Sequence, residues 1–375
     1  MLTGMTLTEG CATAGGTERY RQRFTALQAA HFRPVQDLWA SSIGLGTYLG
    51  DADDATDARY AAAIRTALQR GCNVLDTAIN YRCQRSERAI GATLQALIAE
   101  GGIARDEVLL CTKGGYLPFD GAVPADPARY LARTVINTGL ASYEEIVGGC
   151  HCLAPAYLDH ALRSSLANLR AGAIDIYYLH NPEQQLDEVD RGTVMARLEA
   201  AFALLEEHAR EERIRWYGIA TWRGLRVNPG AKNFLSLAAL ATLAQRIGGT
   251  SHHFRAVQLP YNLAMPEAWA FKNQEIDGAL MSPIDAANRL GLTVMSSASL
   301  LQSRLTELPG GLQERIPGLS TSAQRAIQFV RSTPGVTTAL VGMKEAAHVE
   351  ENLAVAGVAL MDPADFTAIF TRGKR

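Results

Sequence analysis

The chain repeats one pattern many times, in which a helix-forming segment is followed at once by a short, apolar, β-branched segment. In the clearest copy Thr56 begins a helix whose Ile64 and Leu68 share one face, Gly71 ends it, and residues 72–78 form an apolar strand. With a first strand near residues 41–49, the pattern predicts about eight strands, the later six at residues 107–113, 174–180, 214–221, 256–262, 292–298 and 337–343.

This alternation favours a closed (β/α)₈ TIM barrel. Strands that are apolar throughout and separated by helices form parallel sheets covered on the outside, and eight of them suffice to close a barrel. A doubly wound open sheet is the alternative, but no early strand is followed by the Gly-rich dinucleotide fingerprint. We therefore expect a polar N-terminal extension over residues 1–35 and one barrel domain over 36–375.

One connection in this barrel is unusually long. Residues 114–155 separate the third strand from its helix, and connections beyond about 15 residues in a compact domain are either functional or disordered. The segment carries Tyr116, Phe119, Tyr130 and Tyr143, too many apolar side chains for a disordered region. We expect a partly folded lid over the active-site mouth, with an oligomerisation arm as the alternative.

Charge, hydropathy and cysteine content narrow the class of protein further. A net charge of −2 without a basic stripe predicts no nucleic-acid partner, and the absence of a long apolar run predicts no membrane span and a cytoplasmic location. Cys150, His151 and Cys152 carry ligand types that zinc prefers, but zinc sites space their cysteines by two or more residues. We therefore expect no metal.

Active sites of (β/α)₈ barrels lie at the C-terminal ends of the strands, and four ionisable groups fall there. Asp76 ends one strand with Tyr81 in the loop after it, Lys113 ends the next, and His180 ends the fourth. A tyrosine has a pKa of about 10, and we expect Lys113 to lower it by stabilising the phenolate, while Asp76 holds the ammonium group. Tyr81 would then protonate an oxygen as it becomes an alkoxide, with His180 donating a hydrogen bond to the same oxygen.

Such an oxygen arises when a hydride reduces a ketone or an aldehyde, and because no side chain carries a hydride, a nicotinamide or flavin must supply it. Read singly, each residue has a structural alternative: a capping carboxylate, a packing aromatic, a solvated lysine and a core histidine. Their joint placement at three consecutive strand ends favours a catalytic set.

The chain also resembles the aldo/keto reductase superfamily. The motifs that carry the resemblance are "GLGTYLG" at 44–50, "DTAxxY" at 76–81, "SExxIG" at 86–91, "TK" at 112–113, "LHNP" at 179–182, "IRWYGIA" at 214–220 and "QxxYN" at 258–262. The whole resemblance, including the C-terminal cofactor segment described below, covers residues 44–352. The resemblance implies a catalytic tetrad of Asp76, Tyr81, Lys113 and His180 and a barrel that binds NADPH in an extended pose, with NADH as the alternative.

The resemblance also implies a cofactor site, in which several positions depart from the family pattern. The implied contacts are Gly46, Thr47, Thr221, Gln258, Ser297, Gly342, Lys344, His348, Glu351 and Asn352, and the implied substrate pocket holds Tyr48 and Trp222. Ala220 and Thr221 stand where a serine and an asparagine usually bind the nicotinamide amide, Ser297 stands where an aromatic usually stacks, and His348 replaces an arginine. The alternative for Lys344, Glu351 and Asn352 is that they are ordinary surface residues without a role in cofactor binding.

The sequence therefore predicts an NAD(P)H-dependent oxidoreductase that acts on a small-molecule carbonyl or alcohol. Two other functions remain open. The altered nicotinamide contacts would suit an isomerase or epimerase that uses bound nicotinamide for a transient oxidation, and a regulatory subunit could bind cofactor without turnover.

Overall fold

The protein is a closed barrel of eight parallel strands, as the alternating pattern predicts. The structure, a computed structural model, describes residues 7–370. Around the barrel the strand order is β10, β13, β14, β3, β4, β5, β8, β9. The strands span Ile43–Gly46 (β3), Val74–Asp76 (β4), Leu109–Gly114 (β5), Ile174–His180 (β8), Ile214–Ala220 (β9), Phe254–Pro260 (β10), Thr293–Ser297 (β13) and Thr338–Gly342 (β14).

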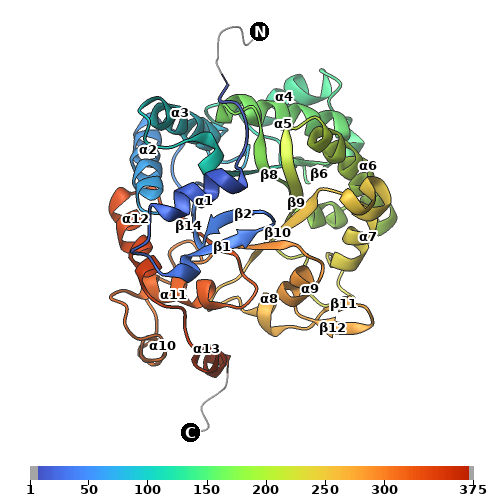
Figure 1. The fold of residues 1–375 in the computed structure, drawn as a ribbon. Coiled ribbons are helices and arrows are strands. Elements are labelled where there is room, and N and C mark those ends of the chain that lie inside the picture. Colours follow the sequence, from blue (N-terminus) through green and yellow to red (C-terminus); the bar gives the residue numbers. More distant parts are fainter. Residues whose placement is uncertain (1–6, 371–375) are drawn as a thin grey trace.

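Helices surround the barrel, and one follows each strand along the chain (Figure 1). They span Asp54–Gln69 (α2), Arg85–Ala99 (α3), Pro155–Leu169 (α5), Arg191–Arg210 (α6), Leu237–Gly248 (α7), Pro283–Arg289 (α9), Ser322–Ser332 (α11) and Ala346–Leu353 (α12). Smaller elements occupy the connections: α8 (Glu267–Ala270), β11 (Gln274–Ile276), β12 (Ala279–Met281) and α10 (Gly310–Arg315). Helix α13 (Pro363–Phe370) follows α12. No helix within residues 7–370 is both long and apolar enough to cross a membrane.

The N-terminus of α2 corrects one expectation. The helix is capped by Asp53, whose side chain accepts a hydrogen bond of 2.8 Å from the backbone N–H of Thr56, so Thr56 lies inside the first turn. Asp and Thr are both good capping residues, and the position of the first helical turn decides between them. Gly71 follows the helix with φ +90°, the left-handed conformation that favours glycine after a helix end.

The inner face of the barrel explains why the predicted catalytic residues converge. Side chains alternate between the two faces of a strand. Ile176 and Tyr178 of β8 are buried in the cluster that fills the barrel, and His180 lies two residues further on the same face. Cys111 and Lys113 of β5 repeat this relation. Lys113 and His180, two of the predicted catalytic side chains, therefore lie in the top layer of the barrel interior.

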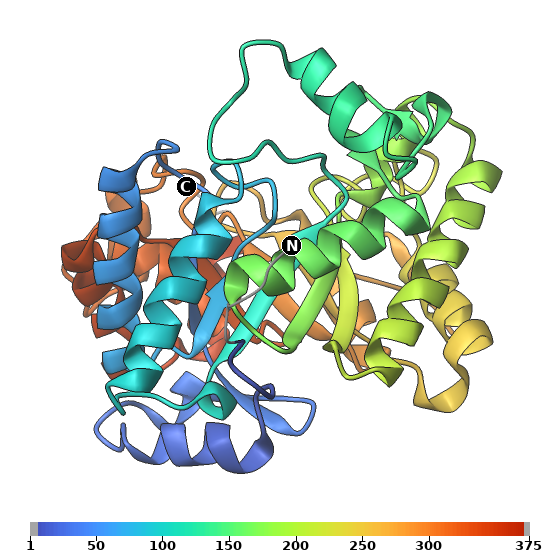
Figure 2. The same cartoon turned by 90° about the horizontal axis from the view of Figure 1, so that it is seen from above.

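The N-terminal segment closes the opposite end of the barrel. Helix α1 (Ala14–Gln22) packs beside a hairpin of β1 (Phe32–Val35) and β2 (Leu38–Ser41), and Val35, Leu38 and Ala40 join the buried cluster inside the barrel. Figure 2 shows this segment below the strands and residues 114–155 above them. The expected domain boundary between residues 35 and 36 falls within the turn of this hairpin. Residues 12–41 are thus an integral cap of the barrel.

The segment 114–155 is partly folded, as its apolar content predicts. It contains α4 (Pro127–Leu131), a π-helical turn at Ala132–Ile136, and a small hairpin of β6 (Ile146–Val147) and β7 (His151–Cys152). Leu117, Val135 and Ala141 are buried in the main core. A small hollow between this segment and α5, lined by Tyr130, Leu140 and Tyr157 among others, shows that the two elements pack together.

Candidate active site

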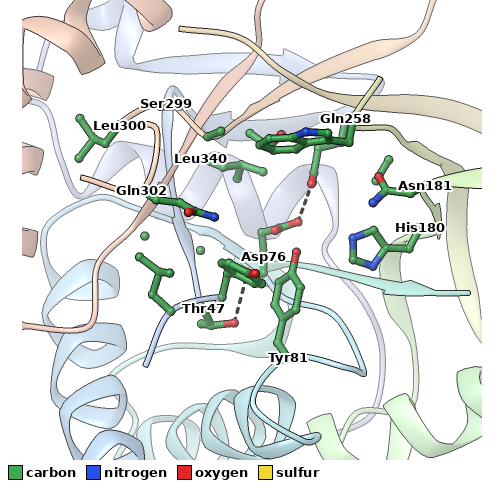
Figure 3. A pocket seen from close by; sticks show the side chains of 18 of the residues that line it. Thr47, Asp76, Tyr81, His180, Asn181, Gln258, Ser299, Leu300, Gln302 and Leu340 are labelled. Atoms are coloured by element: carbon green, nitrogen blue, oxygen red, sulfur yellow. Dashed lines mark hydrogen bonds between the residues drawn. The ribbon is translucent and has the colours of Figure 1, made fainter. Parts of the chain in front are cut away.

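A cavity of about 480 Å³ lies at the C-terminal ends of the barrel strands, where this fold places its active sites. Asp76, Tyr81 and His180 line it, and Figure 3 shows the Tyr81 and His180 rings facing one shared space. Lys113 lies beneath the lining, with its ammonium group 5.1 Å from the centre of the Tyr81 ring. The structure therefore brings together the four side chains that the sequence placed at strand ends.

Asp76 and Lys113 form a buried ion pair, with the Lys113 Nζ 2.7 Å from the Asp76 Oδ2. Lys113 also donates to the carbonyl of Thr77 at 2.7 Å. Burial is the largest single influence and lowers the pKa of Lys113, but the charge of Asp76, the hydrogen bond to it and the other acidic groups nearby together outweigh burial, so the pKa is raised. The ammonium group stays charged although only 1% of the side chain is exposed.

Gln258 holds the other oxygen of this carboxylate, a contact that the sequence did not suggest. Its Nε2 donates to the Asp76 Oδ1 at 2.8 Å, the bond that Figure 3 marks between the two side chains. Gln258 lies two residues before the end of β10, which is four strands from β4 in either direction, so this hydrogen bond crosses the mouth of the barrel. Asp76 is thus fixed from both sides, by a cation below and an amide opposite.

Tyr81 stands between two other aromatic rings. The centre of its ring lies 5.0 Å from that of Tyr48 and 5.8 Å from that of His180, both in an edge-to-face arrangement. Burial raises the pKa of Tyr81 above its usual value, and the attraction of Lys113 offsets only part of that increase. Lys113 lowers this pKa as expected, but the net pKa is raised rather than lowered, because loss of solvent outweighs the cation. Tyr81 is held as a phenol, the form that can give up a proton.

His180 is held as a neutral imidazole. Burial and the nearby Lys113 both lower its pKa well below the usual range. Its Nδ1 is buried and has no hydrogen-bond partner among the described residues, so packing rather than a hydrogen bond orients the ring. A neutral imidazole can still donate one N–H to a substrate oxygen.

A left-handed turn directly after Tyr81 ties that residue to its surroundings. Arg82, Cys83 and Gln84 have φ of 48°, 55° and 71°, a conformation that costs roughly 1–2 kcal/mol per non-glycine residue. Arg82 offsets this cost because its buried guanidinium donates to the carbonyl of Asp51 at 2.8 Å and to the Asp57 carboxylate at 2.5 Å. The strained turn and this anchor fix Tyr81 relative to the β3–α2 loop.

The predicted cofactor residues divide into two groups. Gly46, Thr47, Thr221, Gln258, Ser297 and Gly342 line the cavity, whereas Lys344, His348, Glu351 and Asn352 do not. The Glu351 carboxylate accepts a 2.7 Å hydrogen bond from Thr321, the residue that caps α11. Lys344 extends beside Gly50 in the β3–α2 loop. That the second group binds the cofactor stays a prediction.

Two residues that line the cavity carry buried hydroxyl groups without a protein partner. Thr221 Oγ1 and Ser299 Oγ belong to lining residues, and neither forms a hydrogen bond within the described part of the chain. Buried polar groups are almost always satisfied, so these two positions suit a bound polar molecule. They fit the polar part of a nicotinamide cofactor on the β9–β13 side of the cavity.

The loop after β13 is a wall of the cavity that the sequence analysis missed. Ser299, Leu300, Gln302 and Ser303 line it, and Figure 3 places Leu300 and Gln302 on the side of the cavity away from His180. Leu301, Gln302 and Ser303 all have positive φ. The strand-end rule that selected Ser297 would have found this loop had it been continued a few residues further.

Two more lining residues, Tyr116 and Asn181, complete the wall around His180. Asn181 directly follows His180 in the "LHNP" motif and donates to the hydroxyl of Tyr116 at 3.0 Å. Of residues 115–155, Tyr116 alone lines the cavity, while other parts of the segment pack against α5 and against residues 182–187. The expected lid therefore stands beside the mouth in this structure.

Tyr48 and Trp222, the expected substrate residues, stand at the opening, with 53% and 41% of their surfaces exposed. Trp222 is held by Glu183, whose Oε1 accepts hydrogen bonds from the backbone N–H groups of Trp222, Arg223 and Gly224 at 2.7 to 3.2 Å. Burial raises the pKa of Glu183, which these three donors partly counteract. The buried carboxyl group fixes the start of the loop that carries the tryptophan.

The comparison with protein families identifies the chain. The model of the aldo/keto reductase family matches residues 42–230, so the chain belongs to this family and is an oxidoreductase. A curated relative, the uncharacterized oxidoreductase YqkF of Bacillus subtilis, is 23% identical over 358 residues, which cover 91% of this chain and 95% of the relative.

Solved structures of aldo/keto reductases share the fold. A Klebsiella pneumoniae enzyme in complex with NADP and acetate has a TM-score of 0.58 at 21% identity, covering 89% of this chain and 92% of that one. The glycerol dehydrogenase AKR11B4 of Gluconobacter oxydans has a TM-score of 0.62 at 16% identity, covering 91% and 94%. These likenesses confirm the barrel.

Proposed function

We propose that the protein reduces a carbonyl compound to an alcohol with NADPH, with Tyr81 as the proton donor. The observation that carries this proposal is the arrangement of one phenol, one buried ammonium and one neutral imidazole around a single cavity. Two of the solved neighbours were crystallised with NADP or NADPH, which supports this choice of cofactor. The direct test is stoichiometric consumption of NADPH with an aldehyde such as glyceraldehyde.

In this mechanism each side chain has one task. A bound nicotinamide would supply the hydride. Tyr81 gives its proton to the oxygen that becomes an alkoxide, Lys113 stabilises the negative charge left on the phenolate, and His180 donates a hydrogen bond to the same oxygen. Asp76 and Gln258 keep the ammonium group in place. Thr221, Ser299 and the 301–303 turn would hold the cofactor within the cavity.

The cavity wall favours an uncharged substrate. Aromatic rings, hydroxyl groups and side-chain amides line it, no lysine or arginine among the described residues does so, and the one carboxylate is neutralised by Lys113. A substrate carboxylate would lose its hydration without gaining a cation. We therefore expect neutral aldehydes and ketones to be reduced in preference to keto acids of similar size.

Replacing Lys344 tests the choice between NADPH and NADH. If its ammonium group meets the 2′-phosphate, Lys344→Ala should weaken NADPH binding by about 1.5 to 3 kcal/mol and leave NADH binding nearly unchanged. Dissociation constants for both cofactors measure this, with Lys272→Ala, an exposed lysine in a distant loop, as the control. An unchanged ratio of the two constants in Lys344→Ala would remove this role.

The pH dependence of reduction follows from the shifted pKa values. Tyr81 must be protonated, and its raised pKa keeps it so throughout the neutral and mildly alkaline range. His180 must be neutral, and because its pKa is lowered, it is neutral at every pH above the usual histidine pKa. The rate at saturating NADPH should therefore change by less than about twofold from about pH 7 to 9. A loss of rate on acidification with a midpoint near the usual histidine value would contradict this.

A second function stays open because the nicotinamide side of the cavity departs from the family pattern. Ala220 and Ser297 line it with small side chains, and the amide nitrogen of Gln258 is engaged by Asp76. An isomerase that oxidises its substrate transiently with bound cofactor would convert substrate without net consumption of NADPH. A regulatory subunit would bind cofactor and convert nothing.

A further inference from the structure

His151, the central residue of the Cys150-His151-Cys152 triplet, reaches the catalytic centre from the 114–155 insertion. It lies on β7 and pairs with Tyr116 in an antiparallel bridge, which joins the hairpin to the chain just after β5. Within residues 7–370 no three histidine, cysteine or acidic side chains are grouped to hold a metal ion. The completely buried imidazole must therefore be explained by its hydrogen bonds.

Both nitrogens of His151 are engaged, and their partners fix its tautomer. Gln185 Nε2 lies 2.7 Å from the His151 Nδ1, and the backbone carbonyl of His180 lies 2.7 Å from its Nε2. A carbonyl oxygen can only accept, so Nε2 carries the proton and Nδ1 accepts from the Gln185 amide. Burial lowers the pKa of His151 to about 4, in keeping with a neutral ring.

The support of His151 extends to a neighbouring helix. Arg197 of α6 donates one hydrogen bond to the Gln185 Oε1 and another, of 2.8 Å, to the carbonyl of Glu144. The first bond sets the orientation of the Gln185 amide, so that its nitrogen faces His151. A continuous chain of donors thus runs from α6 through Gln185 and His151 to the backbone of His180.

His180 depends on these contacts because its own ring lacks a hydrogen bond at Nδ1 within the described chain. Two things position the ring: the backbone from which it projects, and the tyrosines that pack against it. His151 holds the first by its bond to the carbonyl, and it meets Tyr116 edge to face at 5.0 Å. Tyr116 in turn meets His180 at 4.9 Å.

The backbone at this point leaves space for the contact. Gly115 has φ +141°, and a Cβ atom there would come within 3.0 Å of both the His151 Nε2 and the His180 carbonyl oxygen. Any larger residue would separate the two groups. The backbone N–H of Cys152 donates to the carbonyl of Gly115 at 2.7 Å, a second hydrogen bond that joins β7 to the chain after β5.

We propose that His151 is a positioning residue, which sets the place of His180 in the active site through the backbone carbonyl of His180 and through Tyr116. This inference rests on the proposed function, in which His180 donates a hydrogen bond to the substrate oxygen. The 114–155 insertion then contributes to catalysis through its β6–β7 hairpin, independently of the rest of the segment.

The first test compares two replacements of His151. His151→Phe keeps a ring but loses both hydrogen bonds, whereas His151→Gln keeps an N–H at the place of Nε2. With NADPH and glyceraldehyde as the probe, His151→Phe should lower kcat at least about tenfold with little change in NADPH affinity, since small displacements of a catalytic group are costly. His151→Gln should recover most of that loss, and exposed His160→Gln serves as the control.

The second test asks whether His151 acts through His180. In a His180→Ala background, His151→Phe should cause no further loss of kcat, because residues that act as one unit are not additive. Additive losses would overturn the inference. So would an unchanged kcat in His151→Phe, or equal losses of kcat and of NADPH affinity in both His151 variants, which would indicate a general folding role.

A spectroscopic readout separates this inference from the proposed reaction. In protein with ¹⁵N-labelled histidine and no cofactor, the ring signals of His180, assigned by their loss in His180→Ala, should move in His151→Phe and not in His151→Gln. Unmoved signals in His151→Phe overturn the positioning role even if NADPH-dependent reduction is confirmed. Moved signals with no reduction of any carbonyl by the wild type would leave the geometry intact and contradict the proposed function instead.

Discussion

Replacement of Tyr81 by phenylalanine is expected to lower the turnover of carbonyl reduction by about 10² or more, the scale of losing a general acid. The phenol is the group beside Lys113 and His180 that can give a proton to the substrate oxygen. The ring contacts with Tyr48 and His180 would persist, so NADPH binding and the unfolding temperature should stay close to those of the wild type. Steady-state kinetics with NADPH and glyceraldehyde, together with NADPH titrations, measure both expectations.

Tyr48→Phe is the matched control for this variant. Its ring lies 5.0 Å from that of Tyr81 in the same cavity, but it stands at the exposed opening, away from Lys113. Loss of this hydroxyl should change KM rather than kcat. If Tyr81→Phe turned over as fast as the wild type, or if both variants lost kcat equally, the proton donor would have to be sought elsewhere.

Replacement of Lys113 by methionine should both inactivate and destabilise the protein. Methionine keeps most of the side-chain volume but leaves the Asp76 carboxylate buried beside Gln258 without its cation, and breaking a buried pair in this way costs about 3 to 5 kcal/mol. Urea unfolding measures the free energy of unfolding. Turnover should fall as well, because the phenolate of Tyr81 would lose the charge that stabilises it.

A double variant separates the two effects of Lys113. In Lys113→Met/Asp76→Asn no charge stays buried, so part of the lost stability should return, while turnover should not. Recovery of turnover along with stability would mean that the ammonium group serves the fold alone. A single Lys113→Met protein as stable as the wild type would show instead that solvent reaches Asp76.

The sequence determined the repeating features of this protein. Helix-strand alternation predicted the barrel and its eight strands, because apolar periodicity is a local property of the chain. The rule that barrels place chemistry at strand ends selected Asp76, Tyr81, Lys113 and His180. In the structure the first two and His180 line one cavity, and Lys113 lies beneath its lining. It also predicted the partly folded insertion, from apolar content alone.

The tertiary structure decided everything that depends on distant residues or on solvent. Gln258 reaches Asp76 only because the barrel closes and brings β10 opposite β4, and His151 reaches His180 only because a hairpin folds back on β5. The net pKa of Tyr81 could not be predicted from its charged neighbour, since burial has the larger effect. Spacing along a chain reveals which residues share a strand end, but contact across a barrel and exclusion of water are set by how the whole chain packs.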